Sequence, residues 1–196
     1  MTAQADSVLS LFRKTGAYLT GHFRLTSGLH SPEYLQSALV LEYPEHAERL
    51  GNQMASALRE LAGRRIDVVV SPALGGLIIG HEVARALGAR FLFTERDPVQ
   101  KMMTLRRGFS VETGEVAVVV EDVITTGGST REVIELLQAN GALVAAAGSI
   151  IDRSGGNADV GAPRVALSTL QVVAYPPEDC PLCREGLPVT KPGSRV

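Results

Sequence analysis

The most informative segment of the chain reads Val118-Val119-Val120-Glu121-Asp122-Val123-Ile124-Thr125-Thr126-Gly127-Gly128-Ser129-Thr130. Its β-branched run is typical of a strand that is buried on both faces. Two adjacent acids follow, then a loop of hydroxyl residues and glycines, and then the beginning of a helix. Because free backbone N–H groups and hydroxyls at a helix N-terminus bind phosphate, the loop predicts a phosphate site.

The two acids, Glu121 and Asp122, are unexpected beside a phosphate site because carboxylates repel phosphate. They suit a ligand with a phosphate at one end and sugar hydroxyls or a metal ion at the other, such as a 5-phosphoribosyl group. The chain has neither a Gly-x-x-x-x-Gly-Lys-Ser/Thr loop nor a Gly-x-Gly-x-x-Gly fingerprint after its first strand. An ordinary turn with a helix cap at Ser129 or Thr130 would leave the adjacent acids unexplained.

Apolar strands alternate with helices on both sides of this segment. We expect strands at 67–71, 90–94, 115–120, 143–151 and 165–170, and helices at 44–61, 77–87 and 130–139. Gly88 and Gly141 end two of these helices. Continuous Val, Ile and Ala strands separated by helices predict an α/β fold, with a central, mostly parallel sheet flanked by helices.

The first part of the chain lacks this regular pattern. The apolar pairs Val8-Leu9, Leu11-Phe12 and Tyr18-Leu19 predict an amphipathic helix that ends near Gly16. Residues 21–41 mix glycine, proline and hydroxyl residues with alternating apolar residues, which indicates short strands and turns.

Polar or glycine-rich segments follow the expected strands at 71–76, 95–108, 121–129 and 152–156. The carboxyl ends of parallel strands meet at one edge of a sheet, and ligands bind beyond that edge. We therefore expect all four segments to build a single site.

The segment 95–109 is long for a connection inside a compact domain, and such loops are often lids. It carries the basic residues Arg96, Lys101, Arg106 and Arg107. These charges predict a lid that closes over an anionic leaving group. The alternative is a solvated, mobile hairpin.

Two shorter segments complete the expected site. Gly75-Gly76 can present backbone N–H groups to an anion, although a plain strand-to-helix turn explains the same residues. Arg153 follows a buried strand, where its guanidinium can bind a carboxylate in a bidentate pair. The alternative for Arg153 is a surface ion pair with Asp152.

Composition limits the possible functions. The 196 residues suggest one domain with a substantial core, and 45% hydrophobic with 20% charged residues is ordinary for a globular protein. A net charge of −2, no Trp and 5% aromatic residues argue against nucleic-acid binding. No basic region followed by an apolar run begins the chain, and the longest apolar runs, such as 142–147, are far too short to span a membrane. We expect a cytoplasmic protein without a membrane partner.

The chain has two cysteines, Cys180 and Cys183, in the order Cys-Pro-Leu-Cys. This spacing is half of a zinc site, and no other cysteine completes it. Three interpretations stay open: a tight turn with reduced thiols, a zinc site completed by a symmetry mate, and a redox pair. The four histidines of the chain are His22, His30, His46 and His81.

The strand, acid pair and Thr-Thr-Gly-Gly-Ser loop together resemble the motif with which type I phosphoribosyltransferases bind 5-phosphoribosyl 1-diphosphate (PRPP). In that family the acids hold the ribose 2′- and 3′-hydroxyls, and the loop surrounds the 5′-phosphate. The resemblance implies PRPP contacts at Glu121, Asp122, Val123, Ile124, Thr125, Thr126, Gly127, Gly128, Ser129, Gly75 and Arg96.

Within that superfamily the chain resembles the orotate phosphoribosyltransferases over nearly its full length. The resemblance rests on segments 23–34, 120–129 and 151–153 and on the tail around Cys180. It implies one domain over 1–196, with a core over about 44–172 and a small hood made by about 1–43 and the C-terminal tail. It also implies orotate contacts at Thr125, Arg153, Ser27 and Tyr34, and catalytic roles for Lys101, Arg107 and Asp122.

The resemblance further implies the reaction of orotate with PRPP to give orotidine 5′-monophosphate and diphosphate, in UMP biosynthesis. It implies Mg²⁺ that arrives on PRPP without a direct protein ligand, and a homodimer in which each flexible lid loop acts on the partner's site. A purine phosphoribosyltransferase and a PRPP-sensing regulator are the alternatives.

Three positions depart from the usual family pattern. Thr26 stands where many members have Lys, Leu74-Gly75 stands where many have Tyr-Lys, and the basic residues of the lid are spaced differently. These changes remove positive charge from the donor site. We expect Mg²⁺ and backbone N–H groups to neutralise more of the diphosphate charge in this chain.

Overall fold

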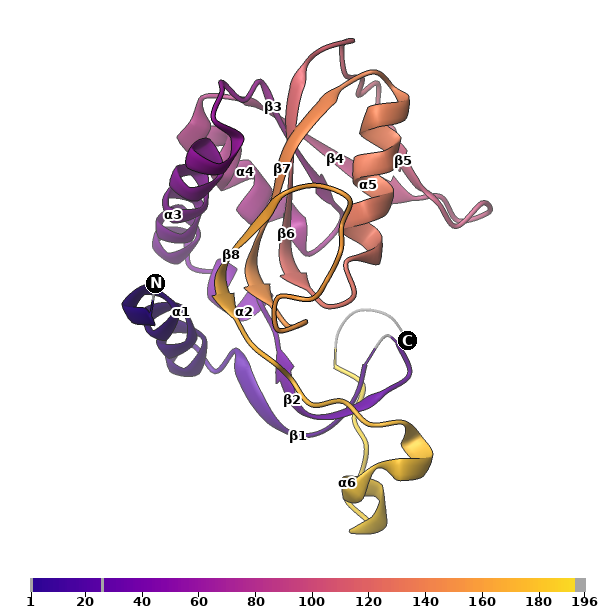
Figure 1. Cartoon of the computed structure of the whole chain (residues 1–196). Helices are drawn as coiled ribbons and strands as arrows, with labels where there is room; N and C mark the ends of the chain where they lie inside the picture. Colours follow the sequence, from indigo (N-terminus) through magenta and orange to yellow (C-terminus); the bar gives the residue numbers. More distant parts are fainter. Residues whose placement is uncertain (1, 26, 193–196) are drawn as a thin grey trace.

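The computed structural model describes residues 2–25 and 27–192, and Thr26 lies outside the described residues. Figure 1 shows a sheet with helices on both faces and a smaller hairpin beyond one of its edges. In chain order the elements are α1 (Thr2–Lys14), β1 (Tyr18–Arg24), β2 (His30–Leu35), α2 (Ala38–Leu41), α3 (Pro44–Ala62), β3 (Val68–Pro72), α4 (Gly76–Leu87), β4 (Arg90–Arg96), β5 (Met103–Leu105), β6 (Val116–Ile124), α5 (Gly128–Ala139), β7 (Leu143–Asp152), β8 (Arg164–Thr169), η1 (Pro177–Asp179) and α6 (Pro181–Arg184).

The central sheet has the strand order β5-β4-β3-β6-β7-β8. Its strands run parallel except β5, which pairs antiparallel with β4. The two faces of β6 supply different cores, since Val118 and Val120 join the cluster with α1, α3 and α4, whereas Ala117 and Val119 join the cluster with α5. The expected α/β fold with a mostly parallel, two-sided sheet is confirmed.

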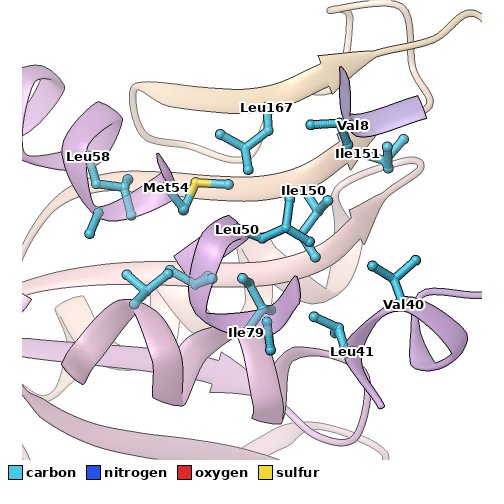
Figure 2. Packing of buried hydrophobic residues seen from close by; sticks show 14 of the residues in the cluster. Val8, Val40, Leu41, Leu50, Met54, Leu58, Ile79, Ile150, Ile151 and Leu167 are labelled. Atoms are coloured by element: carbon cyan, nitrogen blue, oxygen red, sulfur yellow. The ribbon is translucent and has the colours of Figure 1, made fainter. Parts of the chain in front are cut away.

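The larger core cluster lies between α3, α4 and the sheet. Figure 2 shows Leu50, Met54 and Leu58 of α3 pointing toward the sheet, with Ile79 of α4 and Ile150 of β7 beside them. All five side chains are fully buried. The helix pair approaches closely at Gly51, where an added Cβ would lie 2.6 Å from Cβ and 3.0 Å from the carbonyl carbon of Glu82. Glycine at this position therefore sets the distance between α3 and α4.

Several boundaries differ from the expected ones. β6 continues to Ile124, so Glu121 and Asp122 lie within the strand and not after it, and Glu121 is in register with Ser149 of β7. Tyr18 and Leu19 do not belong to the first helix, because α1 ends at Lys14 and they begin β1. The short helix α2 had no sequence signal, and α5 begins two residues before the expected position.

Strands β1 and β2 form a separate antiparallel hairpin, which confirms the short strands expected in this region. The hairpin lies beyond the carboxyl ends of the sheet strands (Figure 1). The C-terminal tail returns to it, because Arg24 and Thr190 share a backbone hydrogen bond of 2.8 Å and His30 exchanges two with Tyr175. We call the hairpin of residues 18–25 and 27–35, which contains β1 and β2, together with tail residues 175–191, the hood.

None of the helices in residues 2–25 and 27–192 has both the length and the apolar character needed to cross a membrane.

We predict that Gly51→Ala destabilises the protein, although alanine favours helix by about 1 kcal/mol over glycine. The new Cβ meets the backbone of Glu82, which cannot rotate away, and such overpacking costs about 1–3 kcal/mol. Chemical denaturation measures the difference in unfolding free energy. Asn52→Ala is the matched control, because Asn52 is exposed on the same turn of α3 and should leave the protein equally or slightly more stable. A Gly51→Ala variant as stable as the Asn52→Ala variant would contradict the close approach of α3 and α4.

Candidate active site

A cavity of about 660 Å³ lies between the carboxyl edge of the sheet and the hood. Its walls come from the hood hairpin, the loop after β3, the end of β6, the loop before α5 and the residue after β7. The lining residues are Leu25, Ser27, Leu29, Tyr34, Leu35, Gln36, Pro72, Ala73, Leu74, Gly75, Met103, Glu121, Asp122, Val123, Thr125, Thr126, Ser129, Arg153, Val172 and Ala174. The expected segments 71–76, 121–129 and 152–156 thus meet in one site at this edge, whereas segment 95–108 contributes Met103 alone and the hood hairpin adds a further wall.

The acid pair lies at the base of this cavity, on the last part of β6. Burial raises the pKa of Glu121 to about 7, an effect that the hydrogen bond from Thr130 Oγ1 reduces and neighbouring Asp122 increases. Burial also raises the pKa of Asp122. Gly75 packs directly over Asp122, since a Cβ there would lie 2.6 Å from Asp122 Oδ1. The two partly buried carboxyl groups therefore enter the cavity from opposite faces of β6, Glu121 beside Thr130 and Asp122 beside Gly75, and they suit hydroxyl donors or a cation.

The loop between β6 and α5 has the backbone of an anion site. Gly127 is the residue before α5 and adopts a left-handed conformation with φ 82°. A Cβ at Gly127 would lie 2.8 Å from Val160 Cγ1, so glycine is required both by conformation and by space. The hydroxyl residues Thr125, Thr126 and Ser129 line the cavity around the N-terminus of α5. Backbone N–H groups, hydroxyls and the helix dipole there favour a phosphate group.

Arg153 enters the cavity from the end of β7, opposite Tyr34 of the hood. The surface pair with Asp152, the alternative for Arg153, is wrong, because Asp152 Oδ2 accepts a hydrogen bond of 2.5 Å from Arg164. Burial alone would raise the pKa of Asp152, but the hydrogen bonds from Ser154 and Arg164 outweigh it and lower that pKa. Arg153 Nε is buried and has no hydrogen-bond partner among the described residues. This guanidinium is available to a planar anionic ligand.

The basic segment forms a hairpin between β4 and β5 that projects from the sheet (Figure 1). Two of its three arginines pair within the chain: Arg96 Nη1 lies 2.9 Å from Glu132, and Arg107 Nε lies 2.8 Å from Glu95. Lys101 is exposed and makes no salt bridge with any residue that the structure describes. Arg96, Lys101 and Arg107 do not line the cavity within one chain, whereas Met103 of the same hairpin does.

Most of the other predicted site residues line the cavity, and three do not. The cavity is lined by Ser27, Tyr34, Gly75, Glu121, Asp122, Val123, Thr125, Thr126, Ser129 and Arg153. Ile124, Gly127 and Gly128 belong to the same segment but do not line it. Apolar walls were missed, among them Leu25, Leu29 and Val172. Alternating apolar residues in the hood were a signal for the first two, while Val172 follows the last strand without a distinguishing pattern.

Three comparisons with known proteins agree with this geometry. Residues 41–177 match the model of the phosphoribosyl transferase domain family. Orotate phosphoribosyltransferase of Pelotomaculum thermopropionicum is 55% identical over 190 residues, which cover 97% of each chain. The Heliobacterium modesticaldum protein of the same name is 53% identical, over 97% of this chain and 98% of its own.

Solved structures agree as well. The crystal structure of orotate phosphoribosyltransferase from Aeropyrum pernix superimposes with a TM-score of 0.69 at 29% identity, covering 84% of this chain and 94% of that chain. The central sheet and its helices thus have the type I phosphoribosyltransferase fold. On its sequence, its fold and its site, the chain belongs to the phosphoribosyltransferase family, and within it to the orotate phosphoribosyltransferases.

Proposed function

We propose that the protein transfers the 5-phosphoribosyl group of PRPP to N1 of orotate, releasing orotidine 5′-monophosphate and diphosphate for UMP synthesis. The observation that carries the proposal is the meeting of three chemistries in one cavity. An acid pair for sugar hydroxyls, a helix N-terminus for a phosphate and an unpartnered arginine for a carboxylate face the same space. PRPP and orotate together present these complementary groups.

The donor end of the cavity accounts for PRPP recognition. The 5′-phosphate is bound by the N–H groups at the beginning of α5 and by the hydroxyls of Thr125, Thr126 and Ser129. The ribose 2′- and 3′-hydroxyls donate to Glu121 and Asp122, whose burial strengthens such hydrogen bonds. Gly75 and its neighbours receive the diphosphate through backbone N–H groups. The sugar is thus held at both ends, with C1′ between them.

The acceptor end accounts for orotate. Arg153 binds the orotate carboxylate, and Tyr34, Ser27 and Thr125 frame the ring. Apolar side chains of the hood, including Leu25 and Leu29, exclude water from the ring face. The reaction passes through a transition state with positive charge at C1′ and negative charge on diphosphate. Positioning and charge stabilisation therefore provide the catalysis, without a protein nucleophile.

The donor end also fits Mg²⁺, because carboxylate oxygens are ligands that this ion prefers. We propose that the ion arrives on PRPP. If Glu121 and Asp122 held it there, it would supply positive charge to stabilise the leaving diphosphate.

We further propose a cytoplasmic homodimer whose basic hairpins act in trans. Lys101 is free of salt bridges within the described chain, yet it lies outside its own cavity. Two apolar side chains of the same hairpin are exposed beside Lys101 in the sequence, since Met102 is 62% and Val99 85% exposed. Such side chains favour a partner surface. A second copy would bury them and bring each Lys101 to the other cavity.

The first test is a substrate panel. Purified protein with PRPP and Mg²⁺ should consume orotate, measured by the loss of its ultraviolet absorbance, but should leave uracil, adenine and hypoxanthine unchanged. Turnover of a purine in place of orotate would establish the purine alternative. PRPP binding by calorimetry without turnover of any base would establish a sensor.

A variant makes the orotate contact testable. Arg153→Met removes the guanidinium and should raise the KM for orotate roughly 10- to 100-fold, since a hydrogen-bonded charge contributes about 1.5–3 kcal/mol. PRPP affinity should change little. Arg131→Met is the matched control, because Arg131 pairs with Asp159 outside the cavity. An unchanged orotate KM in Arg153→Met would remove this residue from the acceptor site.

The raised pKa of Glu121 predicts how PRPP binding depends on pH. The ionised carboxylate accepts hydroxyl hydrogen bonds more strongly than the neutral acid. With a pKa of about 7, its ionised fraction rises about tenfold from pH 6 to pH 8. PRPP affinity measured by calorimetry should therefore rise over this interval. In the Glu121→Gln variant, PRPP affinity should depend on pH only through ionisation of the PRPP phosphates. Equal pH profiles for the two proteins would show that Glu121 does not bind the ribose as a carboxylate.

If each hairpin acts on the partner's cavity, two variants with different defects should restore activity in a mixed dimer. Lys101→Ala should lower kcat more than PRPP affinity, and Asp122→Asn should weaken PRPP binding. In mixed dimers, one of the two sites combines an intact Asp122 with the partner's intact Lys101. Dissociating and reassociating an equal mixture should therefore recover about a quarter of the wild-type activity. Recovery no higher than the average of the separate variants would show that the hairpin acts in cis.

A further inference from the structure

Four metal-binding side chains meet in the hood, away from the cavity. They are His22 on β1, His30 on β2, and Cys180 and Cys183 at α6, and their ligand atoms all lie within 4.8 Å of one another. His22, His30 and Cys180 are buried, and Cys183 is exposed at the edge of the cluster. Sequence separations of about 160 residues between the histidines and the thiols hid this group. The two histidines supply the half-site that the cysteine spacing lacks.

The distances are close to those of a tetrahedral site. Cys180 Sγ lies 3.6 Å and Cys183 Sγ 3.7 Å from His22 Nε2, and Cys183 Sγ lies 3.3 Å from His30 Nδ1. Ligand bonds of about 2.3 Å to sulfur and 2.0 Å to nitrogen give a tetrahedral S···N distance of about 3.5 Å. The His22 Nε2 to His30 Nδ1 distance is 2.8 Å, so these two rings need to separate by about half an ångström around an ion.

A second contact orients one of these rings. His22 Nδ1 lies 2.8 Å from the carbonyl oxygen of Leu187. A carbonyl oxygen only accepts, so Nδ1 carries the proton and Nε2 presents its lone pair to His30 and the thiols. Metal-ligating histidines almost always have such a partner on the other ring nitrogen. The ring is therefore arranged as a ligand before any ion arrives.

We propose that the hood holds one Zn²⁺ ion, bound by His22 Nε2, His30 Nδ1, Cys180 Sγ and Cys183 Sγ. Two thiolates and two imidazoles in tetrahedral arrangement select zinc among the divalent ions of the cell. Four protein ligands leave no open position for a substrate, so the ion is structural and not catalytic. The exposed Cys183 gives the ion its route of entry.

The site links the tail to the hairpin that covers the cavity. On either side of it, backbone hydrogen bonds join Thr190 to His22 and Tyr175 to His30, each at 2.8 Å. Figure 1 shows the C-terminal segment with α6 next to the end of the β1–β2 hairpin. The ion thereby fixes the hood, whose residues Leu25, Ser27 and Tyr34 line the cavity.

The metal content of the full chain tests the proposal without any substrate. Protein purified anaerobically, without added metal or chelator, should contain about one zinc per chain by mass spectrometry of the elements. The same measurement on Cys180→Ser/Cys183→Ser and on His30→Ala should give less than about a tenth of that amount. His81→Ala is the matched control, since His81 is an exposed histidine on α4 and its loss should leave the zinc in place.

Cobalt gives a test that does not depend on a folded variant. After zinc is removed with a chelator, Co²⁺ added to the wild-type chain should produce the strong visible absorption of a tetrahedral ion and a sulfur-to-cobalt charge-transfer band. The chelated chain should also be cut faster by trypsin after Arg184, because the tail has lost its link.

Two results would overturn the site: wild-type protein without zinc that develops no cobalt bands, or zinc that stays in the double cysteine variant. A Cys180–Cys183 disulfide in metal-free protein kept anaerobic would establish the redox pair instead. Unchanged trypsin cleavage after zinc removal would overturn the link between tail and hood.

Discussion

The confinement of two carboxyl groups at the end of a buried strand is the constraint on which the rest of the site depends. Glu121 and Asp122 lie at the end of β6, beside β7, and partial burial raises the pKa of both. A carboxylate in such surroundings is costly unless a ligand supplies donors or positive charge. The same strand leads directly into the glycine-rich loop before α5. β6 therefore fixes the distance between the acid pair and that loop.

Ion pairs within the chain decide which charged side chains are left free to face the cavity. Asp152 and Arg153 are neighbours, yet Arg164 takes the carboxylate and leaves the guanidinium of Arg153 for the cavity. In the hairpin the opposite holds, since Arg96 and Arg107 are each occupied by a glutamate of the same chain. Among the described residues that line the cavity, Arg153 is therefore the only cation.

Local patterns predicted the sheet, its helices and the glycine-containing turn before α5, because strand and helix periodicity and the glycines at 88, 127 and 141 act over a few residues. The sequence predicted that the two acids follow β6. The strand instead continues through them, because pairing of Glu121 with Ser149 of β7 outweighs the low β-propensity of acidic residues. The ion pair of Asp152 and the His/Cys cluster of the hood could not be predicted in this way, because they depend on contacts between residues that are distant in sequence. No local pattern reveals that Arg164 would pair with Asp152, or that His22 would meet Cys180 across 158 residues.

The return of the tail to β1 also affects the order in which the molecule is built. Thr190 pairs with His22, so the hood closes only when nearly the whole chain is available. During synthesis the sheet and its helices emerge earlier and can pack first, whereas contacts of such high sequence separation form late. A partly synthesised chain thus has the loop before α5 in place while the β1–β2 hairpin still lacks its contacts with the tail. A cavity that needs the hood as a wall is therefore completed after the core has formed.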